Sequence, residues 1–280
     1  MASGAIAQPI EVGVALPRRG AAWLSKLTLV AISGVGVASF LYPFLLADAP
    51  RGGEGAARAE DAPLVFALVL SLALLLFVLE LGRDAMNAKT ASLLAVLIVA
   101  AAALRIPTLP AGASAFFFFV IVGGYVFGAR LGFMIGAGAM FVSAFAIGGF
   151  GPWLPFQVFA AGWTGMTAGW LGALLERPLR GHRRMELVAL AMFGALWGFL
   201  FGAIMNLWFW PFVAQGESIS WEPGLGLGET LRHYWSFYLL TSAGWDGFRA
   251  LGNAALVLAA GRPAIDLLTR YRDRFAIRYG

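Results

Sequence analysis

The segment Gly148–Leu175, GGFGPWLPFQVFAAGWTGMTAGWLGALL, restricts most strongly what this chain can fold into. It opens with a turn that contains glycine, proline and Trp153, and it continues as an apolar run with a small residue at nearly every helical turn. Between two equally apolar neighbours, such a helix suits a lipid bilayer, with Trp153 at the level of the headgroups. Gly165 and Gly169 form a GxxxG pair, which lets a second helix approach closely.

The composition favours the same environment. Of the 280 residues, 60% are hydrophobic and 12% charged, which is typical of integral membrane proteins. The net charge of +5 comes from arginines between apolar runs, where lipid headgroups and membrane topology explain them, so we expect no nucleic-acid partner. The absence of cysteine excludes thiolate chemistry, and two histidines far apart predict no metal site and no cofactor.

The apolar runs predict an all-α integral membrane protein with eight membrane-spanning helices. The predicted spans are 27–46, 64–81, 90–106, 113–129, 131–148, 155–175, 186–210 and 234–261. We divide the chain into a tail with two extra transmembrane helices (1–89), a six-helix core (90–262) and a basic tail (263–280). The first span is long for the apolar region of a signal peptide, so we expect it to stay uncleaved.

The basic residues predict the orientation in the membrane. With the N-terminus inside, 15 lysines and arginines fall in cytoplasmic segments and four in external ones. This asymmetry indicates a multi-pass protein of the cytoplasmic membrane with both termini in the cytoplasm.

The sequence lacks the motifs of ATP hydrolysis and of zinc-dependent proteolysis. Neither of the two lysines, Lys26 and Lys89, follows a glycine, so the chain contains no Walker motif, and HExxH is also absent. We therefore expect a transport subunit and no enzyme. Any uphill transport must draw its energy from a partner or from an ion gradient.

The last predicted span carries the most informative polar cluster. Asp246 and Arg249 are three residues apart and can pair on one helix face, with Asn253 one turn further. We expect this cluster near mid-bilayer, where ionisable groups are costly and mark functional sites. The alternative is an internal ion pair that only fixes helix packing.

Further candidates surround this cluster in an expected external pocket. Asn206 lies near Trp210, and these two residues with Trp163 would form its walls; an interfacial aromatic belt is the alternative for the tryptophans. Trp153 belongs to a loop that would close the pocket. Arg105 is either a residue of a second closing loop or an arginine that reaches the interface.

Five segments carry a resemblance to a known family. They are LRIPTLP, GGYVFGARLGFMIGAGAMFVSAF, GGFGPWLPFQVFAAGWTGMTAG, GFLFGAIMNLWFWPF and WDGFRALGNAALVLAAGRP. As a set, within about residues 90–275, they resemble the substrate-specific S component of energy-coupling factor (ECF) transporters, which import vitamins and related micronutrients. The resemblance implies a six-helix core with an extracellular substrate pocket. It also implies a membrane T subunit and two cytoplasmic ATPases as partners.

In that family a small-residue face on the first core helix contacts the T subunit, and Ala91 and Ala95 match it by type and position. The two helices before residue 90 depart from the six-helix pattern. An aromatic pocket suits a large planar vitamin, with cobalamin as the first candidate and riboflavin as the second. Two other classes remain open: a secondary transporter driven by an ion gradient, and an intramembrane enzyme that uses Asp246.

Overall fold

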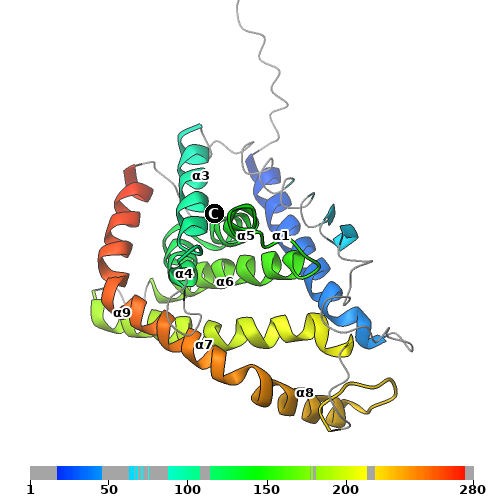
Figure 1. Cartoon of the computed structure of the whole chain (residues 1–280). Helices are drawn as coiled ribbons and strands as arrows, with labels where there is room; N and C mark the ends of the chain where they lie inside the picture. The colour runs from blue at the N-terminus through cyan, green and yellow to red at the C-terminus, as the bar shows by residue number, and fades with distance from the viewer. Residues whose placement is uncertain are drawn as a thin grey trace, which may run out of the picture.

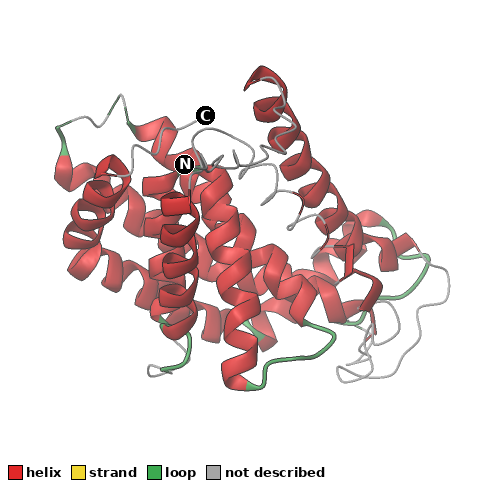
Figure 2. Cartoon of the chain, turned by 90° about the horizontal axis from the view of Figure 1, so that it is seen from above, coloured by secondary structure: helices red, strands yellow, loops and turns green. Residues whose placement is uncertain are grey.

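The computed structural model describes the chain in several ranges. They are residues 18–45, 63–65, 67–68, 71, 75, 88–107, 114–176, 178, 181–212 and 218–274. Within these ranges the regular elements are helices without any strand, as Figure 2 shows. The prediction of an all-α protein is therefore confirmed.

The helices follow one another in a simple order. They are α1 (Arg18–Leu41), η1 (Tyr42–Leu45), α3 (Ala88–Ala103), α4 (Ala115–Phe127), α5 (Ala129–Ile147), α6 (Leu154–Leu175), α7 (Arg183–Phe209), η3 (Trp210–Phe212), α8 (Leu227–Thr241) and α9 (Ala243–Arg274). Among the described residues, five stretches are long and apolar enough to cross a membrane: Lys26–Leu45, Ala129–Ile147, Leu154–Leu175, Arg183–Phe212 and Ala243–Arg274. Most of the predicted span 64–81 lies outside the described residues.

The predicted span 234–261 is wrong in both of its bounds. The helix breaks at Ser242, so that α8 ends at Thr241 and α9 begins at Ala243 and continues to Arg274. At the break Ser242 leaves the helical region (φ −127°, ψ −33°), and its hydroxyl accepts a hydrogen bond from Asn206 of α7. Asp246 therefore lies in the first turn of α9 and is not deep within one long helix.

Glycines set the distance between α5 and α6. A Cβ atom on Gly165 would lie 2.0 Å from the carbonyl oxygen of Gly132, and one on Gly169 would lie 2.2 Å from the backbone nitrogen of Ala129. The close approach predicted from the GxxxG pair is confirmed. Gly128, with φ +87°, joins α4 to α5 and allows the tight hairpin.

The first helix and the first core helix lie on different sides of the bundle (Figure 1). Helix α1 packs on α6 and α7, whereas α3 packs on α5 and α4. Helices α7 and α9 run along each other over much of their length (Figure 1). This last interface carries the predicted polar cluster.

Candidate functional site

A cavity of about 410 Å³ opens between α6, α7 and the junction of α8 with α9. Its lining residues are Trp153, Gln157, Phe201, Gly202, Met205, Asn206, Trp208, Phe209, Thr241, Ser242, Trp245, Asp246 and Arg249. We call it the aromatic cavity. It brings together four of the predicted site residues: Trp153, Asn206, Asp246 and Arg249.

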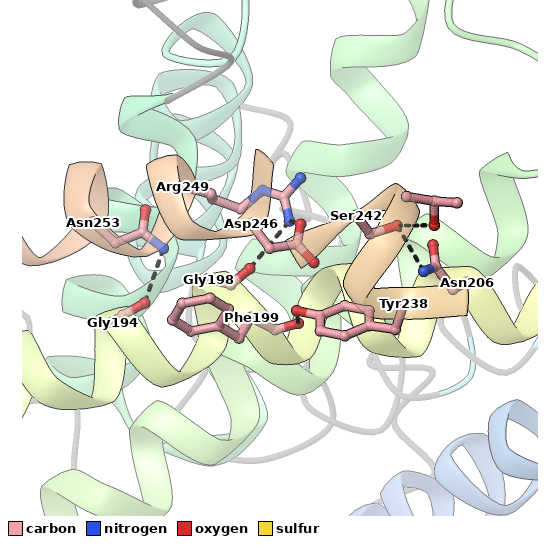
Figure 3. Close-up of polar contacts among 10 residues, drawn as sticks. Gly194, Gly198, Phe199, Asn206, Tyr238, Ser242, Asp246, Arg249 and Asn253 are labelled. Carbon is pink, nitrogen blue, oxygen red and sulfur yellow. Dashed lines mark hydrogen bonds and ion pairs between the residues drawn. The ribbon is translucent and has the colours of Figure 1, made fainter. Parts of the chain in front are cut away.

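The ion pair predicted from the spacing of Asp246 and Arg249 is present (Figure 3). Arg249 Nη1 lies 2.5 Å from Asp246 Oδ1 and also donates to the carbonyl oxygen of Gly198 at 3.1 Å. The guanidinium carbon lies 5.4 Å from the centre of the Phe201 ring, which adds a cation–π contact. The aspartate side chain is 3% exposed and the arginine 21%, so the arginine is the more accessible of the two charges.

Three glycines of α7 allow this polar face of α9 to approach. A Cβ atom on Gly202 would lie 1.8 Å from Asp246 Oδ2, and Asn253 donates to the carbonyl oxygen of Gly194 at 3.0 Å. With Gly198, these residues stand one turn apart along α7. The four-residue spacing of these glycines marks a small-residue helix face in the sequence, but it does not show that the face accommodates charge.

Two buried polar atoms of α9 have no hydrogen-bond partner among the described residues: Asp246 Oδ2 and Asn253 Oδ1. The Tyr238 hydroxyl, which lies beside Asp246 in Figure 3, interacts with this carboxylate electrostatically and as a weak hydrogen-bond donor, and it also makes a long 3.5 Å hydrogen bond to Phe199 O. An unsatisfied carboxylate oxygen is costly in a protein interior. Asp246 Oδ2 is turned toward Gly202 of α7 and has almost no accessible surface, so Arg249 is the charged group of this pair that a ligand in the cavity can reach.

Asn206 fixes the geometry of the cavity at the helix break. Its side-chain amide donates a 2.7 Å hydrogen bond to Ser242 Oγ, and that hydroxyl is also 3.1 Å from Thr241 Oγ1. The contact joins α7 to the end of α8. Sequence reasoning missed Thr241 and Ser242, although the run Thr-Ser-Ala-Gly at 241–244 is a signal that could have located the break.

Three predicted pocket residues do not line the aromatic cavity. Trp163 faces α1, where its indole donates to Ser33 Oγ at 3.2 Å. Trp210 is buried in another aromatic cluster, and its indole donates to Ile219 O at 2.8 Å. Asn253 is buried between α9 and α7.

Arg105 does not line the aromatic cavity, but it contacts a residue that does. Its guanidinium donates to Ser143 Oγ at 2.9 Å and to Gln157 Oε1 at 3.2 Å, and Gln157 lines the cavity. Arg105 opens the second predicted closing loop, residues 105–111, most of which lies outside the described residues.

A second cavity, of about 380 Å³, lies at the opposite ends of α4, α6, α7 and α9, and we call it the ion-pair cavity. Tyr125 donates to Glu186 at 2.7 Å, and Arg262 pairs with both Glu186 at 3.2 Å and Asp266 at 2.6 Å. The spacing of Arg262 and Asp266 was visible in the sequence. The contribution of Glu186 was not, because it comes from another helix.

The predicted partner face is on α3. Ala95 is exposed and Ala91 is half-buried, and the exposed surface continues over Val96 and Val99. Helix α3 makes its main contacts with α4 and α5 on its other side.

Comparison with protein families gives one match: residues 88–260 fit the model described as ECF transporter, substrate-specific component. The match begins at α3 and includes every residue that lines the aromatic cavity, whereas α1 lies outside it. Comparisons with curated proteins and with solved structures give no match.

Proposed function

This chain belongs to the substrate-specific components of ECF transporters, and we propose that it binds a vitamin or related micronutrient in the aromatic cavity and delivers it inward. It is a transport subunit and a multi-pass membrane protein, and the family associates with T-type and ATPase components. The observation that carries the proposal is a cavity of about 410 Å³ with aromatic walls and a few convergent polar groups. Small-molecule sites typically combine these properties.

The cavity chemistry favours riboflavin over cobalamin as the substrate. Trp153 and Trp208 offer flat apolar surfaces, and a corrin ring with its nucleotide arm is far larger than a cavity of about 410 Å³. Arg249 lines the cavity with a partly exposed guanidinium and supplies hydrogen-bond donors there. The carbonyl oxygens of the riboflavin ring system are complementary acceptors.

The test is ligand binding by the purified protein. We expect riboflavin to be retained on purification or to bind in titration, and Trp208→Ala to weaken that binding. Trp170→Ala is the matched control, because Trp170 is exposed on α6 and lines neither cavity. Equal affinity in wild type and Trp208→Ala would place the substrate elsewhere.

We propose that Ala91 and Ala95 on α3 form the docking face for the T subunit, with two ATPases completing the complex. The exposure of Ala95 and the position of α1 on a different side of the bundle support this proposal. Ala95→Trp should reduce uptake and co-purification with the ATPases and leave substrate binding unchanged. An equal loss of binding would mean that Ala95 packs inside the bundle.

We also propose a cytoplasmic location for both termini, which places the aromatic cavity on the external side of the cytoplasmic membrane. The distribution of basic residues supports this orientation. Reporters fused at Gly53, Arg183 and Gly280 should report outside, inside and inside. An external signal at Arg183 would reverse the assignment.

A further inference from the structure

Helix α1, which precedes the region shared with the family, makes a specific interface with α6. Ser33 Oγ accepts a 3.2 Å hydrogen bond from Trp163, and the Phe40 ring lies 5.0 Å from the Phe156 ring. Gly36 lies between them, and a Cβ atom there would come within 2.6 Å of the Trp163 ring. These contacts recur at about one-turn intervals on a single face of α1, which indicates defined packing.

The interface continues into the wall of the aromatic cavity. Phe156, fully buried behind the wall, stacks on Trp208 with ring centres 6.0 Å apart and planes 20° apart. Trp208 in turn lies 6.5 Å from Trp153, and both tryptophans line the cavity. Phe40 of α1 thus reaches the cavity through one intermediate ring.

The end of this N-terminal helix makes a second aromatic connection. Phe44 in η1 lies 5.8 Å from Trp210 and 5.5 Å from Trp221, measured between ring centres. Trp221 belongs to the segment that precedes α8, so α1 and η1 contact both α6 and the connection from α7 to α8. The opposite face of α1 is exposed, with Val37 at 49%.

We infer that α1 supports the wall of the substrate site. In this role Phe40 is a positioning residue that holds the ring of Trp208 in place through Phe156. This inference rests on the proposed function of the aromatic cavity. Phe40 is 3% exposed, and its removal leaves a void behind Phe156 that lets the stacked rings rotate. If the ligand must order the side chains of the wall when it binds, that ordering costs free energy and lowers the affinity, compared with a wall whose side chains are already fixed.

The first measurement needs no ligand. In full-length protein labelled with fluorotryptophan, the fluorine resonance of Trp208 is identified by its loss in Trp208→Phe. We expect Phe40→Ala to shift or broaden this resonance and Val37→Ala, on the exposed face of α1, to leave it unchanged. A Trp208 resonance that is identical in Phe40→Ala and wild type would overturn the inference.

The second measurement is a double-mutant cycle with riboflavin as the probe. Phe40→Ala should lower the affinity about two- to tenfold, the range typical of one aromatic pair. In the Trp208→Ala background it should cause no further loss, because Phe40 acts through Trp208. An equal loss in both backgrounds would show a general packing effect and would also overturn the inference.

The two proposals fail separately. If wild-type protein does not bind riboflavin, the proposed substrate is wrong, and the fluorine resonance still decides whether Phe40 holds Trp208. If Trp208→Ala weakens binding and Phe40→Ala changes neither the resonance nor the affinity, the proposed function stands and α1 has no part in the site.

Discussion

The two cavities are nearly equal in volume, about 410 and 380 Å³, but they treat their polar groups in opposite ways. In the ion-pair cavity Glu186 uses one oxygen for Tyr125 and the other for Arg262, and both oxygens of Asp266 accept from Arg262. In the aromatic cavity Asp246 shares only one oxygen with Arg249, and the other has no hydrogen-bond partner among the described residues.

This difference concerns stability more than access for a ligand, because the second oxygen of Asp246 lies against Gly202 with almost no accessible surface. The ion-pair cavity connects α4, α7 and α9 through groups that already bind one another. The aromatic cavity instead offers indole and phenyl rings and the partly exposed guanidinium of Arg249. Capacity for a ligand therefore follows the chemistry of the accessible groups more closely than volume.

The largest expected effect is at the buried Asp246–Arg249 pair of the aromatic cavity. Arg249→Ala leaves the Asp246 carboxylate buried without its countercharge, which should cost about 3–5 kcal/mol of folding stability. Thermal unfolding in detergent measures it. The double variant Asp246→Asn with Arg249→Ala should recover most of the loss, because no lone charge remains. A single variant as stable as wild type would show that Asp246 does not depend on Arg249.

The next effect concerns Gly202, whose lack of a side chain lets the Asp246 carboxylate lie against α7. Gly202→Ala places a methyl group where Asp246 Oδ2 now lies, and the overpacking should cost about 1–3 kcal/mol. Gly228→Ala in α8 is the matched control, since nothing lies within 4 Å of its added Cβ. Equal unfolding temperatures for the two variants would mean that α9 moves freely away from α7.

A smaller effect is expected on ligand affinity. Asn206→Ala removes the hydrogen bond to Ser242 and a polar group of the wall, which should weaken binding by about 0.5–1.5 kcal/mol. Riboflavin titration measures the affinity, and the unfolding temperature shows that the variant is folded. Unchanged affinity in a folded variant would remove Asn206 from the site.

The smallest effect is expected at the ion-pair cavity. Arg262→Gln removes contacts between partly exposed side chains, so the change in stability should be only about 0–1 kcal/mol, and it should shrink at high salt. Substrate affinity should stay at the wild-type value. A loss comparable to that of Asn206→Ala would break the distinction between the two cavities.

The sequence was sufficient where the signal is local. The apolar runs predicted the helices of the core, the GxxxG pair predicted a close approach by another helix, and the three-residue spacing predicted the Asp246–Arg249 pair. Each of these depends on residues a few positions apart or on one helix face.

It was insufficient where the partner is remote. Trp163 and Trp210 lie on or beside α6 and α7, which do line the aromatic cavity, but their indoles donate hydrogen bonds to Ser33 and Ile219 instead. The periodicity of apolar residues does not predict that these distant segments meet. The side-chain hydrogen bond at the Ser242 break comes from Asn206, 36 positions earlier. Which face of an apolar helix meets lipid, a cavity or another helix is decided by packing, and all three faces look alike in the sequence.

Helix α9 is the one element that borders both cavities with charged side chains, Asp246 at its start and Arg262 and Asp266 further along. The stretch from Asp246 to Asp266 rises about 30 Å, close to the thickness of the hydrocarbon core of a bilayer. Pro263 interrupts its backbone hydrogen bonds, and α9 changes direction along its length (Figure 1).

The Arg262–Asp266 pair spans that proline, with one partner before it and the other after it. Two side-chain hydrogen bonds therefore brace the turn at Pro263, next to the turn in which the proline removes the backbone hydrogen bond to the carbonyl of residue 259. Loss of this pair should leave α9 freer to bend at Pro263, between the end that lines the aromatic cavity and the end that lines the ion-pair cavity.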